Sequence, residues 1–93
     1  MEAYDTDRFV EEANKNHTPL IDVRPAEMFA EGHIPGAVNI PLADMDHADV
    51  KSGSDFYCMT GYHAGLAKAA LAKRGISVTD IGGMDYYHGP VAR

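Results

Sequence analysis

Cys58 is the only cysteine among the 93 residues, and it lies in the stretch FYCMTGYHAG (56–65), where it could act as a nucleophile. The reactive form of cysteine is the thiolate, and the free N–H groups and dipole at the start of a helix stabilise a negative charge. If residues 59–63 turn the chain into a helix that begins near Ala64, their amides would surround the sulfur. This placement favours a reactive thiolate, although a lone cysteine taken by itself is more often a small buried apolar residue.

The elements on either side of Cys58 can place it at a ligand-binding edge. DFYC (55–58) is typical of a short strand that ends at the cysteine, and the alanine-rich AGLAKAALAKRG (64–75) predicts a helix that stops at its final glycine. Gly61 suits the turn between them, because a tight loop needs a residue that tolerates positive φ. Ligands of open α/β sheets bind at the carboxyl ends of the strands.

The rest of the chain predicts further strands that alternate with helices. Helices are expected at 5–16 and 26–32, one or two helical turns at 42–50, and strands at 19–23, 37–41 and 76–81, followed by a Gly-Gly turn and another helical turn. Short apolar strands between helices are typical of a parallel sheet with helices on both faces. The length fits one small α/β domain that spans 1–93.

Composition and charge exclude several classes of function. The formal net charge is -6, which argues against nucleic acid or an anionic membrane as a partner. No apolar run is long enough to cross a bilayer, and no signal-peptide pattern is present. A single cysteine cannot form an internal disulfide. These features predict a soluble protein of the reducing cytoplasm.

Two longer blocks are LIDVRPAEMFAEGHIPGAVNIP (20–41), which contains Asp-x-Arg and Gly-His-Ile-Pro-Gly-Ala, and YCMTGYHAGLAKAALAKRG (57–75). They resemble the paired N-terminal motifs and the active-site loop with its helix in the single-domain rhodaneses, a family of thiosulfate sulfurtransferases. The ending DIGGMDYY (80–87) resembles the family's Gly-Gly turn and following aromatic residue. The resemblance covers nearly the whole chain. It implies a rhodanese-like sheet of four to five parallel strands, flanked by helices on both faces.

The resemblance also implies a reaction and a set of binding residues. The Cys58 thiolate would attack the outer sulfur of thiosulfate or another donor, sulfite would leave, and cyanide or a thiol would take the sulfur from the resulting persulfide. No cofactor is required, and a sulfur-relay protein could serve as a partner. The thiolate and the persulfide would be bound by the loop amides of Met59, Thr60, Gly61, Tyr62, His63 and Ala64.

The chain departs from the commonest family pattern at two places. His63 occupies a loop position where many members carry arginine or lysine, and histidine is only partly charged near neutral pH. His63 could therefore assist a dianionic donor weakly, or simply face solvent. The tryptophan that often follows the Gly-Gly turn is absent, and Tyr86 or Tyr87 would fill its space.

Three further residues are expected to support the site. Asp22 and Arg24 could bind substrate, but a partly buried ion pair that orders the loops is preferred, because each buried charge needs a partner. His33 is expected to be a structural, hydrogen-bonded histidine. No metal is predicted, because no combination of Cys58 with the histidines has a recognised zinc spacing.

Other activities remain as alternatives. A cysteine phosphatase needs Cys-x5-Arg, and the position of that arginine is occupied by Ala64. A redox function is disfavoured because there is no second cysteine. A non-catalytic rhodanese-like module that binds a partner, or a sulfur carrier loaded by a protein persulfide, stays open.

Overall fold

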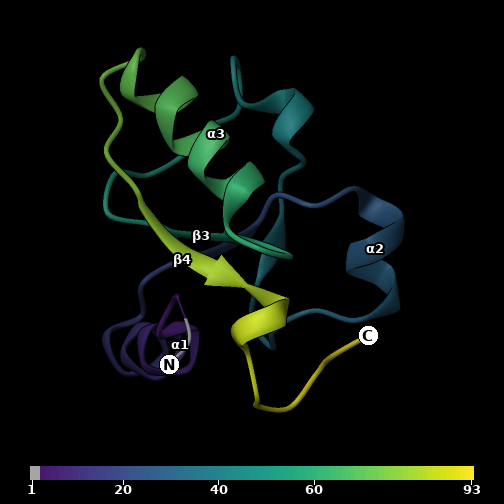
Figure 1. Ribbon diagram of the computed structural model, residues 1–93. Helices are drawn as coiled ribbons and strands as arrows, with labels where there is room; N and C mark the ends of the chain where they lie inside the picture. The colour runs from purple at the N-terminus through teal and green to yellow at the C-terminus, as the bar shows by residue number, and fades with distance from the viewer. Residues whose placement is uncertain (1–2) are drawn as a thin grey trace.

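Four parallel strands form the centre of the computed structural model, which describes residues 3–93 (Figure 1). They are β1 (Leu20–Asp22), β2 (Val38–Asn39), β3 (Asp55–Cys58) and β4 (Thr79–Gly83), and their order in the sheet is β2-β1-β3-β4. The connecting elements are α1 (Thr6–Asn16), α2 (Ala26–Glu31), α3 (Tyr62–Ala72) and the short 3₁₀ helices η1 (Leu42–Asp44) and η2 (Met84–Tyr86).

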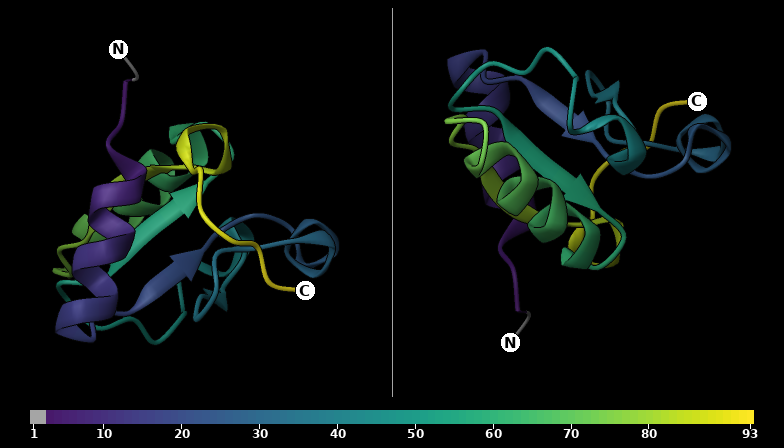
Figure 2. Two further views of the ribbon diagram at one scale, coloured as in Figure 1. Left: turned by 90° about the horizontal axis from the view of Figure 1, so that it is seen from below. Right: turned by 90° about the horizontal axis from the view of Figure 1, so that it is seen from above.

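Helices α1 and α3 cover opposite faces of the sheet (Figure 2). Successive residues of a strand point to opposite faces, so β3 contributes Phe56 and Cys58 to one core and Tyr57 to the other. Ala64, Ala67 and Leu71 of α3 pack in the first core, and Val10 and Ala13 of α1 pack in the second. The prediction of a parallel α/β sheet with helices on both faces is confirmed.

The strands end on the side of the molecule where α2 lies (Figure 1). The backbone of β1 continues toward this side, where Val23 N–H bonds to Tyr57 O at 3.0 Å and Leu42 N–H bonds to Val23 O at 3.0 Å. This carboxyl edge of the sheet, at which Asp22 and Cys58 end their strands, therefore brings together the loops that follow β1, β2 and β3.

The last strand differs most from the sequence prediction. The expected strand at 76–81 is displaced, since β4 runs from Thr79 to Gly83 and includes both glycines that were expected to form a turn. Ile76 instead closes the end of α3, because its N–H bonds to Leu71 O at 3.0 Å. The backbone of Gly83 approaches Cys58 and Met59 too closely for a side chain, and a side chain on Gly82 would meet Tyr4 and Thr6.

Other element boundaries shift by smaller amounts. Helix α3 begins at Tyr62, two residues before the expected start, which leaves only 59–61 as the loop after Cys58. The helical turns expected over 42–50 are reduced to η1, and the second strand is limited to Val38–Asn39. Within residues 3–93, no helix has both the length and the hydropathy needed to cross a membrane.

Candidate active site

Cys58 lies at the end of β3, directly before the loop that starts α3. Its Sγ accepts a hydrogen bond from the Gly61 N–H at an N···S distance of 3.0 Å, and the thiol can donate to Gly82 O at 3.9 Å. Gly61 is the residue before the helix and has a φ of 96°, as the tight turn requires. The sulfur is thus in contact with a backbone donor at the positive end of the α3 dipole.

The remaining loop amides are arranged differently from a complete ring around the sulfur. Tyr62 N–H bonds to Thr60 Oγ1 at 3.3 Å. Because α3 begins at Tyr62, the N–H groups of His63 and Ala64 have no partner within the helix. They make no hydrogen bond to any residue in the described part of the chain. One amide therefore contacts Sγ directly, and two more remain available at the same helix end.

The Cys58 side chain is fully buried. It packs in the apolar core beneath α3 together with Val23, Phe56 and Ala64. Among the other residues expected to bind substrate, Met59 is half-buried, Gly61 is buried, and Thr60, Tyr62 and His63 are exposed. The sulfur is therefore enclosed by the core beneath α3 and has no contact with solvent.

A bulge in β4 shapes the other side of the sulfur. Phe56 pairs with Asp80, but Cys58 pairs with Gly83, so β4 holds one extra residue between these positions. Gly82, with a φ of 98°, lies in this bulge and directs its carbonyl toward Sγ. A side chain on Gly83 would overlap the Cys58 carbonyl, so Gly83 is needed for the close approach of β4 to the Cys58 loop.

Tyr4 is a residue of the site that the sequence did not indicate. A Cβ on Gly61 or on Gly82 would lie only 2.7 Å from Tyr4 atoms, so this ring covers the two glycines that contact the sulfur. The Tyr4 hydroxyl donates to Asp80 Oδ2 at 3.3 Å, and the ring lies 5.3 Å from that of Tyr86. Burial and the nearby Asp80 charge raise the pKa of Tyr4. No local pattern links residues so far apart in the chain.

Asp22 and Arg24 form a buried ion pair at the end of β1. Arg24 Nη2 lies 2.7 Å from Asp22 Oδ2, and the side chains are 6% and 0% exposed. The same nitrogen donates to Gly32 O at 2.6 Å, so the pair ties the end of α2 to the sheet. Burial acts against the charged guanidinium, but the bonds to Asp22 outweigh it and raise the pKa of Arg24. The guanidinium therefore holds the end of β1 and the end of α2 together, although Arg24 also lines the pocket described below.

His33 lies away from the sulfur and is held by its own neighbours. Its Nδ1 is 2.8 Å from Phe29 O, its ring stacks on Phe29 with centroids 3.7 Å apart, and its backbone pairs with Ala92. These contacts describe a structural histidine. Within residues 3–93, no group of three or more His, Cys, Asp or Glu side chains is placed to hold a metal ion.

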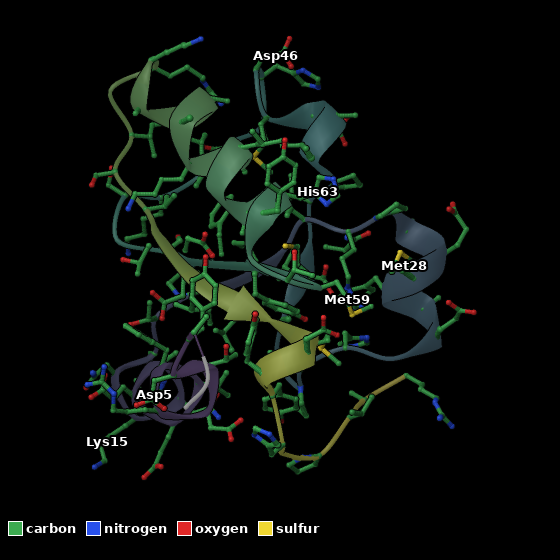
Figure 3. All side chains as sticks on the ribbon, viewed as in Figure 1. Asp5, Lys15, Met28, Asp46, Met59 and His63 are labelled. Carbon is green, nitrogen blue, oxygen red and sulfur yellow. The ribbon has the colours of Figure 1, made fainter. Side chains whose placement is uncertain are left out.

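A pocket of about 450 Å³ opens beside the Cys58 loop. Figure 3 shows Met28, Met59 and His63 on the side where α2 approaches the start of α3. Seven of the nine lining residues are apolar, and the two others are Arg24 and His63. The apolar members come from α2, η1 and the loops that follow β1, β2 and β3: Val23, Pro25, Met28, Pro41, Leu42, Ala43 and Met59.

Comparisons with known proteins agree on the family. The family model described as "Rhodanese-like domain" matches residues 5–89. The thiosulfate sulfurtransferase PspE of Escherichia coli is 34% identical over 71 residues, which cover 69% of this chain and 68% of that protein. A solved structure described as a rhodanese with anions from E. coli has a TM-score of 0.72 and 30% identity, covering 82% of this chain and 98% of that one.

A shorter region of the chain is similar to part of a larger protein. The HTH-type transcriptional regulator Rv0324 of Mycobacterium tuberculosis is 45% identical over 47 residues, which are 46% of this chain but only 21% of the regulator. The match thus leaves most of the regulator's length outside the comparison. The family model, by contrast, spans the sheet, the Cys58 loop and the helices described above. The chain therefore belongs to the rhodanese-like domain family.

Proposed function

We propose that the chain acts as one sulfurtransferase domain in the cytoplasm, and that it carries the transferred sulfur as a persulfide on Cys58. The observation that carries this proposal is the 3.0 Å hydrogen bond from Gly61 N–H to Sγ at the start of α3. A backbone donor and a helix dipole at one sulfur favour the thiolate, which is the nucleophilic form. Membership of the rhodanese-like family and the similarity to a thiosulfate sulfurtransferase support the same chemistry.

The proposed reaction proceeds by two displacements at sulfur. The Cys58 thiolate attacks the outer sulfur of thiosulfate, the S–S bond of the donor breaks, and sulfite leaves with the electron pair. A nucleophilic acceptor, cyanide or a thiol, then attacks the terminal sulfur and releases the Cys58 thiolate. Gly61 N–H stabilises the inner sulfur in both steps, and the free N–H groups of His63 and Ala64 are available to the outer one.

Mass spectrometry of the intact protein tests the persulfide directly. After treatment with thiosulfate, the wild type is expected to gain the mass of one sulfur atom, which a reducing agent then removes. Cys58→Ser preserves the size of the side chain and is expected to gain nothing. An equal gain in both proteins would show that the sulfur resides elsewhere.

The complete burial of Cys58 favours a second candidate, a non-catalytic module that binds a partner. The two functions differ in whether reagents reach the sulfur of the folded protein. Iodoacetamide should alkylate Cys58 at a measurable rate if the loop opens for catalysis. A cysteine that reacts only after unfolding, and that neither thiosulfate nor a protein persulfide can load, would establish the binding module. Loading by the protein persulfide alone would identify a sulfur carrier.

A further inference from the structure

The segment that leads into α1 is fastened to β4 by two side-chain hydrogen bonds. Thr6 Oγ1 donates to Ile81 O at 2.6 Å, and the Tyr4 hydroxyl donates to Asp80 Oδ2 at 3.3 Å. Thr6 is fully buried at the start of α1, whereas Tyr4 lies outside the helix and is half-buried. The segment can therefore loosen at Tyr4 while Thr6 stays bonded, because contacts that water reaches open at lower cost.

The bond from Tyr4 extends to the bulge of β4 that faces the sulfur. The Asp80 carboxylate accepts from the Tyr4 hydroxyl through Oδ2, and it accepts from the Gly82 N–H through Oδ1 at 3.0 Å. Gly82 in turn directs its carbonyl toward Cys58 Sγ at 3.9 Å. Tyr4 is thus connected to the surroundings of the sulfur through one carboxylate and one glycine.

The ring of Tyr4 also lies across both backbone segments that contact the sulfur. A Cβ added to Gly82 would lie 2.7 Å from Tyr4 Cβ and Cγ, and one added to Gly61 would lie 2.7 Å from Tyr4 Cζ and Oη. The ring therefore spans from the bulge to the turn, with Gly82 at its base and Gly61 at its hydroxyl end. Any displacement of either glycine toward Tyr4 meets this ring.

Access to the buried sulfur requires that one part of its enclosure moves. Cys58 is fully buried, so a donor does not reach Sγ in this closed arrangement. Phe56 and Ala64 enclose the sulfur beneath α3, and displacing such fully buried core residues would open cavities. The turn through Gly61 is a loop, and the half-buried Tyr4 ring packs behind it. The turn and Tyr4 are therefore the parts of the enclosure that move at the lowest cost.

We propose that Tyr4 is a positioning residue that governs the opening of the Cys58 loop. In the closed arrangement its ring holds Gly61 and Gly82 against the sulfur. When the ring moves away, the turn enters the vacated space and Sγ becomes accessible. Tyr4 acts on the sulfur through the two glycines. The inference rests on the proposed function, because the loop must open before a donor can load Cys58.

Alkylation of the folded protein by iodoacetamide measures the opening of the loop. Tyr4→Ala removes the ring and should raise the alkylation rate of Cys58 about tenfold, the change expected when a contact worth about 1.4 kcal/mol to the closed loop is lost. Tyr4→Phe keeps the ring and loses only the bond to Asp80, so it should retain most of the protection. The rate at which thiosulfate adds one sulfur to the intact protein should follow the same order among the variants.

Val10→Ala is the control for a general loss of stability. Val10 is 6% exposed and packs in the core beneath α1, on the other face of the sheet from Cys58. Its truncation therefore destabilises the fold without removing the ring from the two glycines. Urea unfolding gives the free energy of unfolding of each variant, and this value sets the alkylation rate expected through global unfolding. Val10→Ala should react no faster than the wild-type rate plus this contribution.

The decisive comparison is the alkylation rate of Tyr4→Ala against the contribution of its own global unfolding. A rate clearly above that contribution supports the inference. A rate that its loss of global stability fully explains would overturn the inference, while a persulfide on the wild type would leave the proposed function intact. Failure of every donor to load the wild type would instead overturn the proposed function. Circular dichroism of each variant confirms that the compared proteins are folded.

Discussion

Two buried carboxylates, one at each end of the sheet, differ in whether their side chains have partners. Asp22 at the carboxyl edge is fully buried and bonds to the Arg24 guanidinium. Asp55 begins β3 at the amino edge, is only 8% exposed, and has no cation or hydrogen-bond donor at its side chain within the described residues. Burial, followed by the charge of Glu12, raises the pKa of Asp55 to about 6.

The difference shows where the fold requires fixed polar geometry. The partnered carboxylate holds the loop and helix that border the candidate site, through the bond from Arg24 to Gly32 O. The unpartnered one lies at the far end of β3, where no proposed chemistry depends on its position. At pH 7 the ionised Asp55 reduces the stability of the fold, whereas the paired Asp22 organises the site.

The largest effect is expected from breaking the pair at the carboxyl edge. Arg24→Met leaves the buried Asp22 charge without its guanidinium partner and the Gly32 carbonyl without this donor. Urea unfolding should show a loss of about 3–5 kcal/mol in the free energy of unfolding. Arg8→Met is the control, because Arg8 makes only exposed pairs and should cost less than about 1 kcal/mol. Equal losses in the two variants would show that the buried Arg24 pair contributes no more to stability than the exposed pairs of Arg8.

A smaller loss is expected where the carboxyl edge depends on backbone contact. In Gly83→Ala the new methyl group meets the Cys58 carbonyl and the Met59 backbone, and such overpacking costs about 2–3 kcal/mol. Gly36→Ala serves as the control. Its φ of 86° is unfavourable for alanine but the space around it is open, so only the backbone cost of about 1 kcal/mol applies. A Gly83→Ala protein as stable as Gly36→Ala would contradict the close approach.

At the amino edge, removing the charge should stabilise the protein. Folding raises the pKa of Asp55 from its ordinary value of 3.8 to about 6, so its contribution to stability is fully present below pH 3.8 and is lost as the pH rises through 6. Asp55→Asn should therefore be more stable than the wild type by about 1–2 kcal/mol at pH 8 and nearly equal to it at pH 3. Thermal unfolding at both pH values measures this. Asp49→Asn, at an exposed position, should show no such pH dependence. An Asp55→Asn protein less stable than the wild type at pH 8 would refute the raised pKa of Asp55.

The smallest expected effect concerns charge at the pocket. His63→Arg adds a permanent cation to the lining and should lower the KM for thiosulfate about threefold, the range of an exposed ion pair. Steady-state assays with Asn16→Arg, which adds the same charge at the exposed end of α1, separate a local effect from a change in net charge. An identical KM in the two variants would argue against a role for His63 in donor binding.

Local patterns were sufficient to predict the elements that hold the site. The apolar run that ends at Cys58, the alanine-rich helix and the Asp-x-Arg pair depend on neighbours in sequence, and the structure contains all three. The position of β4 was missed because Ile76 and Val78 are typical strand residues, whereas Gly82 and Gly83 enter the strand only through contact with a distant loop. The burial of Cys58 was missed for the same reason, since burial depends on how the layers pack.

The ring of Tyr4 gives the segment ahead of α1 a practical importance. Because this ring covers Gly61 and Gly82, Tyr4 packs behind the two glycines that contact the Cys58 sulfur. An affinity tag or a truncation introduced next to Tyr4 would disturb its contacts with these glycines. Activity measured on such a preparation would then report on the altered terminus as well as on the native protein.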